Sequence, residues 1–171
     1  MTKESPSRPP IAKTKRTFHI VASRFNAQYV DGLVNHVTKE LRALAPNGTI
    51  LLHRVPGSFE IPVVAREVAI QNQSDAIIAC GVILQGETDH AQNLSRSVTD
   101  ALQRIAIKHG VPVINAVLSF DNENQARARC LENKINRGTE AARAAVEIAN
   151  VLSEVRTNQG AAVLKPARDN G

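Results

Sequence analysis

The residues best suited to chemistry lie in the stretch 81–90, which reads GVILQGETDH. A short apolar run at 75–80 precedes it and is typical of a strand buried on both faces. An amphipathic helix follows and should begin near His90, because Asp89 and Gln92 have capping-box spacing. Backbone N–H groups at a helix start favour an anion such as phosphate, and a histidine there can exchange protons near neutral pH. The stretch therefore predicts a reaction site with a phosphate cradle.

His90 is the best candidate for proton transfer among the five histidines. His19 and His53 lie within predicted strands, His36 lies in mid-helix, and His109 lies at a helix end. Most histidines are structural, but a helix start beside a glycine turn favours a functional role for His90.

An anion held at residues 86–88 would need a cationic partner, and arginine binds phosphate through two parallel hydrogen bonds. Arg127, Arg129 and Arg137 all follow the fourth predicted strand. Each could equally be a solvated surface charge, and spacing alone does not choose among the three.

Two further residues each have a structural and a functional interpretation. Glu60 follows Gly57, Ser58 and Phe59 at a predicted helix start, where a carboxylate is favourable for the helix itself. It could also accept hydrogen bonds from the hydroxyls of a sugar-like group. Phe25, in a predicted turn, could be ordinary core or could stack on a flat heterocycle.

Several common chemistries lack a motif in this sequence. There is no Walker A or G-x-G-x-x-G pattern, no metal-binding spacing, and no recognisable serine or cysteine nucleophile. Cys80 and Cys130 do not make a disulfide framework, which fits a reducing, cytoplasmic compartment. No apolar run approaches the roughly 20 residues that cross a bilayer, and no signal peptide is expected.

The net charge of +5 is concentrated at the two ends of the chain, and the body between them is close to neutral. A nucleic-acid-binding domain would carry a basic patch with aromatic residues on its folded surface, so this class of function is disfavoured. We expect a flexible, basic, Pro-rich tail at 1–16, one domain at 17–156, and a flexible tail at 157–171.

Strands and helices alternate four times along the expected domain. Strands are predicted at 18–22, 49–53, 75–80 and 111–118, and the last two helices at about 121–129 and 139–155, the first of these capped by Asp121. This alternation predicts an α/β fold with a four-stranded parallel sheet and helices on both faces. All exit loops then meet at one sheet edge, which brings together Phe25, residues 58–60, residues 85–90 and the loop at Ser119.

With these motifs placed, the sequence resembles the lumazine synthase family of riboflavin biosynthesis over about residues 18–152. The resemblance rests on six segments in order: SRFN at 23–26, VPGSFEIP at 55–62, GETDH at 86–90, GVPV at 110–113, ENQA at 123–126 leading to Arg129, and NRG at 136–138. It implies a flavodoxin-like three-layer αβα sandwich and a transferase that uses no metal or organic cofactor.

The implied reaction joins 5-amino-6-(D-ribitylamino)uracil and 3,4-dihydroxy-2-butanone 4-phosphate into 6,7-dimethyl-8-ribityllumazine. By resemblance, His90 is the acid/base group, Arg129 with Glu87 and Thr88 binds phosphate, and Phe25 stacks on the pyrimidine. The remaining implied substrate contacts are Ser58, Phe59, Glu60, Val82, Ile83, Leu84, Asn115 and Arg137.

Three positions depart from the family pattern. Gln85 replaces a residue that is usually basic, Ala91 replaces a common aromatic, and Asn115 stands where Phe is frequent. None of them is His90 or Arg129, so the expected activity is kept. The alternative is a catalytically weak paralogue that binds flavin or lumazine, or that mainly forms shells.

The resemblance also implies a homo-oligomer, either a pentamer or a 60-subunit shell, with sites between neighbouring subunits and a possible association with riboflavin synthase. In the family an N-terminal segment can add a strand to a neighbour's sheet. Here that segment contains Pro6, Pro9 and Pro10, which cannot donate to the ladder. The segment 129–138 shows no insertion relative to shell-forming members, but the prolines weigh more, so we expect an isolated pentamer.

Overall fold

The computed structural model describes residues 7–86 and 89–157. The elements in chain order are β1 (Thr17–Ser23), α1 (Ala27–Leu44), β2 (Thr49–Val55), the 3-10 turn η1 (Ser58–Glu60), α2 (Ile61–Ile70), β3 (Ala76–Leu84), α3 (His90–His109), β4 (Val113–Phe120), α4 (Glu123–Cys130) and α5 (Arg137–Thr157).

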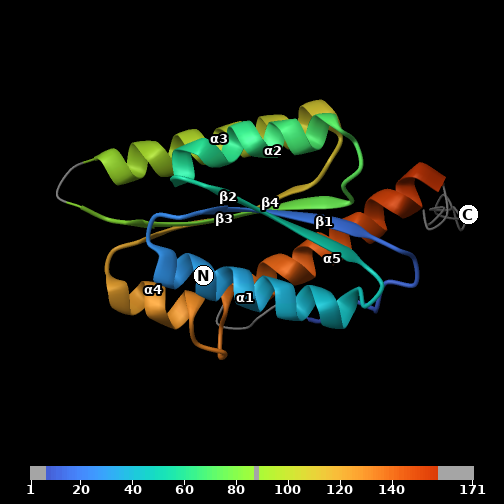
Figure 1. Ribbon diagram of the computed structural model, residues 1–171, viewed down its shortest axis with the longest axis horizontal. Helices are drawn as coiled ribbons and strands as arrows, with labels where there is room; N and C mark the ends of the chain where they lie inside the picture. The colour runs from blue at the N-terminus through green and yellow to red at the C-terminus, as the bar shows by residue number, and fades with distance from the viewer. Residues whose placement is uncertain (1–6, 87–88, 158–171) are drawn as a thin grey trace, which may run out of the picture.

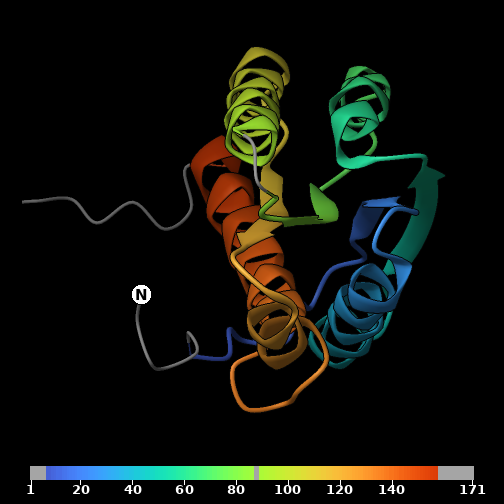
Figure 2. The same ribbon diagram turned by 90° about the vertical axis from the view of Figure 1, so that its left-hand side faces the viewer.

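The four strands form one parallel sheet in the order β2-β1-β3-β4. Helices α2 and α3 cover one face of this sheet, and α1, α4 and α5 cover the other (Figure 1). Figure 2 looks toward the end of the molecule at which the strands finish and shows the two helical layers on either side of the sheet. The prediction of a three-layer α/β sandwich is therefore confirmed.

Strand β3 lies at the centre of the sheet and is longer than predicted. Eight of its nine residues are buried, because β1 and β4 flank it and helices cover both faces. The predicted strand ended at Cys80, but pairing with β4 continues from Gly81 opposite Val117 to Leu84 opposite Phe120. That boundary was wrong because backbone pairing, rather than the apolar run before the glycine, decides where the strand ends.

Predicted boundaries of other elements are shifted too, and β2, for example, continues to Val55 beyond its predicted end at His53. Strand β4 begins at Val113 rather than residue 111, since Pro112 has no N–H to donate, and it includes Ser119, which was predicted to lie in a loop. Helix α5 begins at Arg137, two residues before its predicted start. The buried Asn136 side chain accepts hydrogen bonds from the N–H groups of Gly138 and Thr139 there, at 2.8 and 3.3 Å.

The predicted helix caps also differ. Helix α3 does begin at His90, but its N-cap residue Asp89 makes no side-chain capping bond, so the capping-box prediction was wrong. Helix α4 is capped by Asn122, whose Oδ1 accepts from the Gln125 N–H at 3.0 Å. Asp121, the predicted cap, instead exchanges hydrogen bonds with the Gln125 side chain.

The core is divided by the sheet into two aliphatic clusters, one under α1, α4 and α5 and the other under α2 and α3. Cys80 and Cys130 both belong to the first cluster and are unpaired. Burial raises the pKa of each thiol to about 12, so both behave as small apolar groups, as predicted for Cys80. Among the described residues no helix is long and apolar enough to cross a membrane.

The N-terminal residues 7–16 are extended and pack against the helical layer of their own chain. The Ala12 N–H donates to the Leu44 carbonyl at 2.7 Å. The Arg8 guanidinium donates twice to Glu40, at 3.0 and 2.9 Å, and Arg143 donates to the same carboxylate at 2.9 Å. The flexibility of residues 1–16 and the domain limits stay predictions.

The Glu40 cluster predicts acid sensitivity. Hydrogen bonds from Arg8 and Arg143 hold the pKa of Glu40 at about 2, below its ordinary value of 4.5. Because the folded-state pKa is the lower one, the stabilisation is present above about pH 4.5 and is lost as the pH falls toward 2. Thermal unfolding measured across this window should show a shallower pH dependence for Glu40→Gln than for the wild type. The exposed Glu132→Gln is the matched control, and an equal effect of both variants would contradict the assignment.

Gly81 lets η1 approach the sheet closely, which gives a second prediction. A Cβ at this position would lie 2.6 Å from Ser58 Oγ and 3.2 Å from Val117 Cγ1. Gly81→Ala should therefore lower the free energy of unfolding by about 1–3 kcal/mol in urea denaturation. Part of this loss should vanish in a Ser58→Ala background, where the nearest atom is missing. Gly86→Ala, with nothing within 4 Å, is the control; equal losses in both backgrounds would contradict the contact with Ser58.

Candidate active site

The exit loops of β1, β2 and β3 meet, as predicted, around a cavity of about 470 Å³ at the carboxyl edge of the sheet. The elements η1, β3 and α3 contribute to its walls, together with the turn between β1 and α1 and the loop before η1. The lining residues are Phe25, Asn26, Gly57, Ser58, Phe59, Val82, Ile83, Leu84, His90, Ala91 and Leu94. Seven of the residues predicted to bind substrate or transfer protons are thus brought together.

Two exposed aromatic rings border this cavity. Phe25 lies in the turn between β1 and α1 and is 72% exposed, so its interpretation as a core residue was wrong. Phe59 in η1 is 66% exposed. Exposed apolar side chains that gather at one cavity are typical of a surface that contacts another molecule. Both rings are therefore available to pack on a flat ligand.

The floor of the cavity is the last part of β3. Val82 and Ile83 are buried and Leu84 is half-buried, so the floor is apolar. The sheet ladder ends here, with Leu84 opposite Phe120. On the other side, pairing with β1 already ends at Cys80 opposite Ala22, so residues 82–84 have no β1 partner where they line the cavity.

Ser58 and Glu60 stand on η1 at the side of the cavity. Ser58 is buried and lines the cavity, while Glu60 is half-buried. Glu60 Oε2 accepts from the Gly57 N–H at 2.8 Å, which supports the interpretation of Glu60 as a first-turn carboxylate. This bond also holds the carboxylate beside the cavity wall, so its role toward a ligand stays a prediction.

His90 is the first residue of α3, and its exposed side chain lines the cavity. Ala91, one of the departures from the family pattern, is buried behind it in the core under α2 and α3. His19 and His53 lie in strands, as predicted, and stack on each other away from this edge, with Nδ1 and Nε2 2.9 Å apart. His90 is thus the histidine that lines this cavity.

The predicted phosphate site is incomplete in the described part of the chain. Glu87 and Thr88 lie outside the described residues. Arg129 is half-buried on α4, which lies at the same end of the molecule as the carboxyl edge (Figure 1), but it does not line the cavity. Arg127, the alternative, is exposed on the same helix.

Asn115 and Arg137 lie in a different cavity, of about 400 Å³, between β4 and α5. Asn115 donates to Thr99 Oγ1 at 3.0 Å, and Arg137 pairs with Glu140. In the sheet register Asn115 stands opposite Ala79, three residues before Val82, so it is roughly 10 Å along the strand from the start of the cavity floor. One copy of the chain therefore does not bring these two residues to His90.

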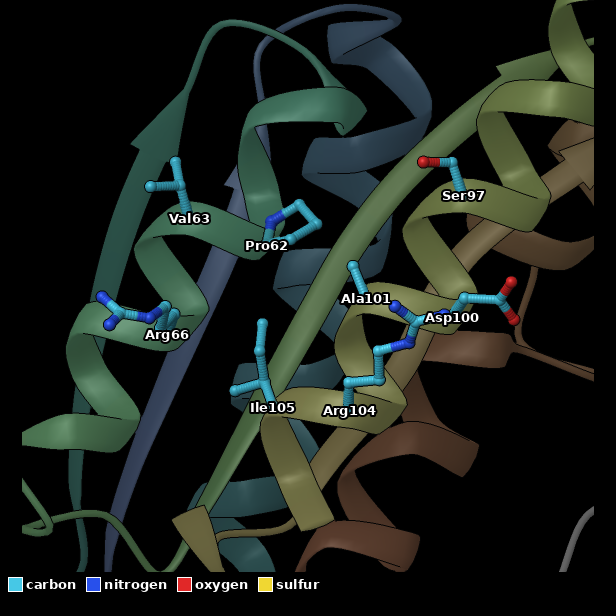
Figure 3. A pocket seen from close by; sticks show the side chains of 8 residues that line it. All are labelled: Pro62, Val63, Arg66, Ser97, Asp100, Ala101, Arg104 and Ile105. Atoms are coloured by element: carbon cyan, nitrogen blue, oxygen red, sulfur yellow. The ribbon is translucent and has the colours of Figure 1, made fainter. Parts of the chain in front are cut away.

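A larger groove of about 540 Å³ separates α2 from α3 (Figure 3). Pro62, Val63 and Arg66 line it from α2, and Arg104 and Ile105 line it from α3. No histidine and no aromatic ring lines this groove, so it offers neither the proton transfer nor the stacking of the first cavity. Within the described ranges, no cluster of three or more His, Cys, Asp or Glu side chains could hold a metal ion.

Asn26 is a cavity residue that the sequence analysis did not assign a role. Its backbone is left-handed, with φ 56° and ψ 42°, and its Nδ2 donates to the Val82 carbonyl at 2.8 Å. The available signal was an asparagine between a strand and a helix, because asparagine tolerates this backbone region better than most residues.

Comparison with known proteins agrees with this geometry. A family model described as 6,7-dimethyl-8-ribityllumazine synthase matches residues 15–153. Proteins of that name from Paraburkholderia phymatum and Burkholderia multivorans are 43% and 42% identical over 133 residues, covering 77% of this chain and 75% of each relative. The protein of that name from Paraburkholderia phytofirmans is 41% identical, with 77% of both chains covered. The chain belongs to the 6,7-dimethyl-8-ribityllumazine synthase family.

Proposed function

We propose that this chain condenses 5-amino-6-(D-ribitylamino)uracil with 3,4-dihydroxy-2-butanone 4-phosphate to 6,7-dimethyl-8-ribityllumazine, releasing phosphate and water. The observation that carries the proposal is the cavity in which the exposed Phe25 ring, the apolar floor at Val82 and the His90 side chain come together. Nothing in the fold or the comparisons favours the alternative of a weakly active binding or shell-forming paralogue.

The geometry suits each part of this reaction. The pyrimidine would lie between the Phe25 ring and the end of β3, where Val82, Ile83 and Leu84 line the cavity and have no paired residue on the β1 side. The ribityl hydroxyls would meet Ser58 and Glu60 on η1. Because two substrates held side by side react as if intramolecular, positioning supplies much of the rate.

His90 would move the protons that the condensation requires. The substrate amine attacks the ketone carbon and loses a proton, and the oxygen leaves as water after it is protonated. Phosphate is then eliminated as a second proton is removed from carbon, and ring closure releases water again. An imidazole at the cavity rim can accept and return protons at each of these steps.

The second half of the site would come from another copy of the chain. Asn115 and Arg137 line the separate cavity beside β4, and Arg129 lies on α4 outside the His90 cavity. If these residues contact the same substrates as His90, two copies must place their cavities against each other. We therefore propose a homo-oligomer with sites shared between neighbouring subunits.

We propose the isolated pentamer rather than the 60-subunit shell. Pro9 and Pro10 lack the N–H groups that a strand added to a neighbour's sheet must donate. Residues 8–16 are moreover engaged with their own chain through Arg8 and Ala12. A cytoplasmic location, supported by the two unpaired cysteines, and an association with riboflavin synthase complete the proposal.

The role of His90 predicts a loss of turnover without a loss of structure. His90→Ala should lower kcat for lumazine formation by about 10²-fold, the usual scale for general acid–base catalysis. Asn93→Ala, an exposed change in the same turn of α3, should leave kcat unchanged. Turnover of His90→Ala within a factor of two of the wild type would remove this histidine from the mechanism.

The role of Arg129 predicts a selective loss of affinity. A bidentate phosphate contact is worth roughly 1.5–3 kcal/mol, so Arg129→Ala should raise KM for the butanone phosphate about tenfold or more. KM for the pyrimidine should change little. The matched control is Arg127→Ala on the same helix. A larger effect of that control, or equal weakening of both substrates, would contradict the assignment.

The assembly is tested by the mass in solution. Light scattering at physiological salt should give about five chains per particle for an isolated pentamer. About sixty chains per particle would show that the prolines do not prevent the shell.

A further inference from the structure

Asn26 occupies a helix N-cap without capping the helix. Asparagine at this position usually accepts a hydrogen bond from the second or third N–H of the helix. Here no side-chain capping bond is present, and Nδ2 instead donates 2.8 Å away to the carbonyl of Val82, 56 positions later in the chain. The side chain therefore joins the turn after β1 to the end of β3.

The turn that Asn26 joins to β3 is the one that carries the Phe25 ring. Two backbone bonds hold this turn on its other side: Arg24 N donates to the Val55 carbonyl at 2.8 Å, and Phe25 N donates to the Pro56 carbonyl at 3.2 Å. These bonds locate the turn relative to β2. The bond from Asn26 locates it relative to β3, which forms the cavity floor.

An exposed ring has little packing to define its position. Phe25 is 72% exposed, so its place above the floor depends on the backbone of the turn. Asn26, which directly follows Phe25, has a left-handed backbone. Its side-chain amide donates a hydrogen bond to β3, the strand that the Phe25 ring must face. Asparagine meets both demands, because it tolerates positive φ and carries an N–H donor.

We propose that Asn26 is a positioning residue for the pyrimidine: it sets the gap between the Phe25 ring and the end of β3 into which the flat heterocycle fits. The inference rests on the proposed function and specifies how the cavity selects a planar substrate. Asn26 acts through Phe25 and Val82. Its bond also uses one lone pair of the Val82 carbonyl, which directs a ligand to the neighbouring backbone groups.

Three variants separate the two demands on this residue. Asn26→Gly keeps the left-handed backbone and removes the donor. Asn26→Asp keeps the shape but presents a carboxylate to the Val82 carbonyl, and it regains a donor when protonated. Asn72→Gly is the matched control. Among the described residues, Asn72 and Asn26 are the two that are not glycine and have a positive φ, which is 52° at Asn72. Asn72 follows α2 and does not line the cavity.

In steady-state kinetics the expected result is a change in KM for one substrate and not for the other. Asn26→Gly should raise KM for the ribitylaminouracil about fivefold or more, with kcat and KM for the butanone phosphate changed less than twofold. The effect should disappear in a Phe25→Ala background, because Asn26 acts through the ring. Asn26→Asp should match Asn26→Gly at pH 7.5 and recover relative to the wild type as the pH falls toward 5. An unchanged KM, or equal losses with and without Phe25, would overturn the inference.

A second measurement does not depend on turnover. The chain contains no tryptophan, so a single introduced tryptophan can be followed by fluorescence. In the Phe25→Trp variant the indole is the sole tryptophan, and its fluorescence anisotropy reports the order of the turn. Adding Asn26→Gly should lower this anisotropy, and adding Asn72→Gly should not. Unchanged anisotropy with Asn26→Gly would overturn the inference even in an active enzyme. A wild type that forms no lumazine would instead refute the proposed function, whatever the anisotropy shows.

Discussion

The backbone of β3 must find all its hydrogen-bond partners inside the protein, because the strand is shut off from water on both faces. Eight of its nine residues are buried between two helical layers, and β1 and β4 supply partners on its two sides. This requirement sets the length of the strand, which continues past Gly81 for as long as β4 offers a partner. It also bears on where the site lies, since pairing with β1 ends at Cys80 and residues 82–84 then line the cavity.

The same requirement connects the distant parts of the site. Gly81 has no side chain, so η1 and its buried Ser58 can lie against the strand. The Val82 carbonyl accepts from Asn26, which brings the turn with Phe25 over the strand end. His90 follows directly, because α3 starts six residues after β3 ends. The cavity therefore lies where β3 continues beyond its last β1 partner, and its walls are the segments that meet this part of the strand.

Much of this arrangement could be predicted from the sequence, and the limits have physical causes. Alternating apolar runs and amphipathic helices predicted the parallel sheet, and parallel strands place all exit loops at one edge, which brought Phe25, Ser58 and His90 together as expected. The end of β3 was missed because partner strands, rather than local apolarity, extend it. Asn122 replaced Asp121 as a cap because both residues favour that role and backbone geometry chooses between them. Asn115 and Arg137 could not be placed against His90, because their distance from it depends on how copies of the chain pack.

The two buried cysteines can report local opening of the structure through their rates of alkylation. Burial raises the pKa of each thiol to about 12, so the thiols are protonated at neutral pH, whereas alkylating reagents attack the ionised form. Alkylation therefore requires a local opening of the structure that exposes the thiol to water. Cys80 lies in the central strand and Cys130 at the end of the short helix α4, so each thiol is exposed by a different local opening. The alkylation rate of Cys80 would thus measure the opening of the sheet, and the rate of Cys130 would separately measure the fraying of α4, the helix that carries Arg129.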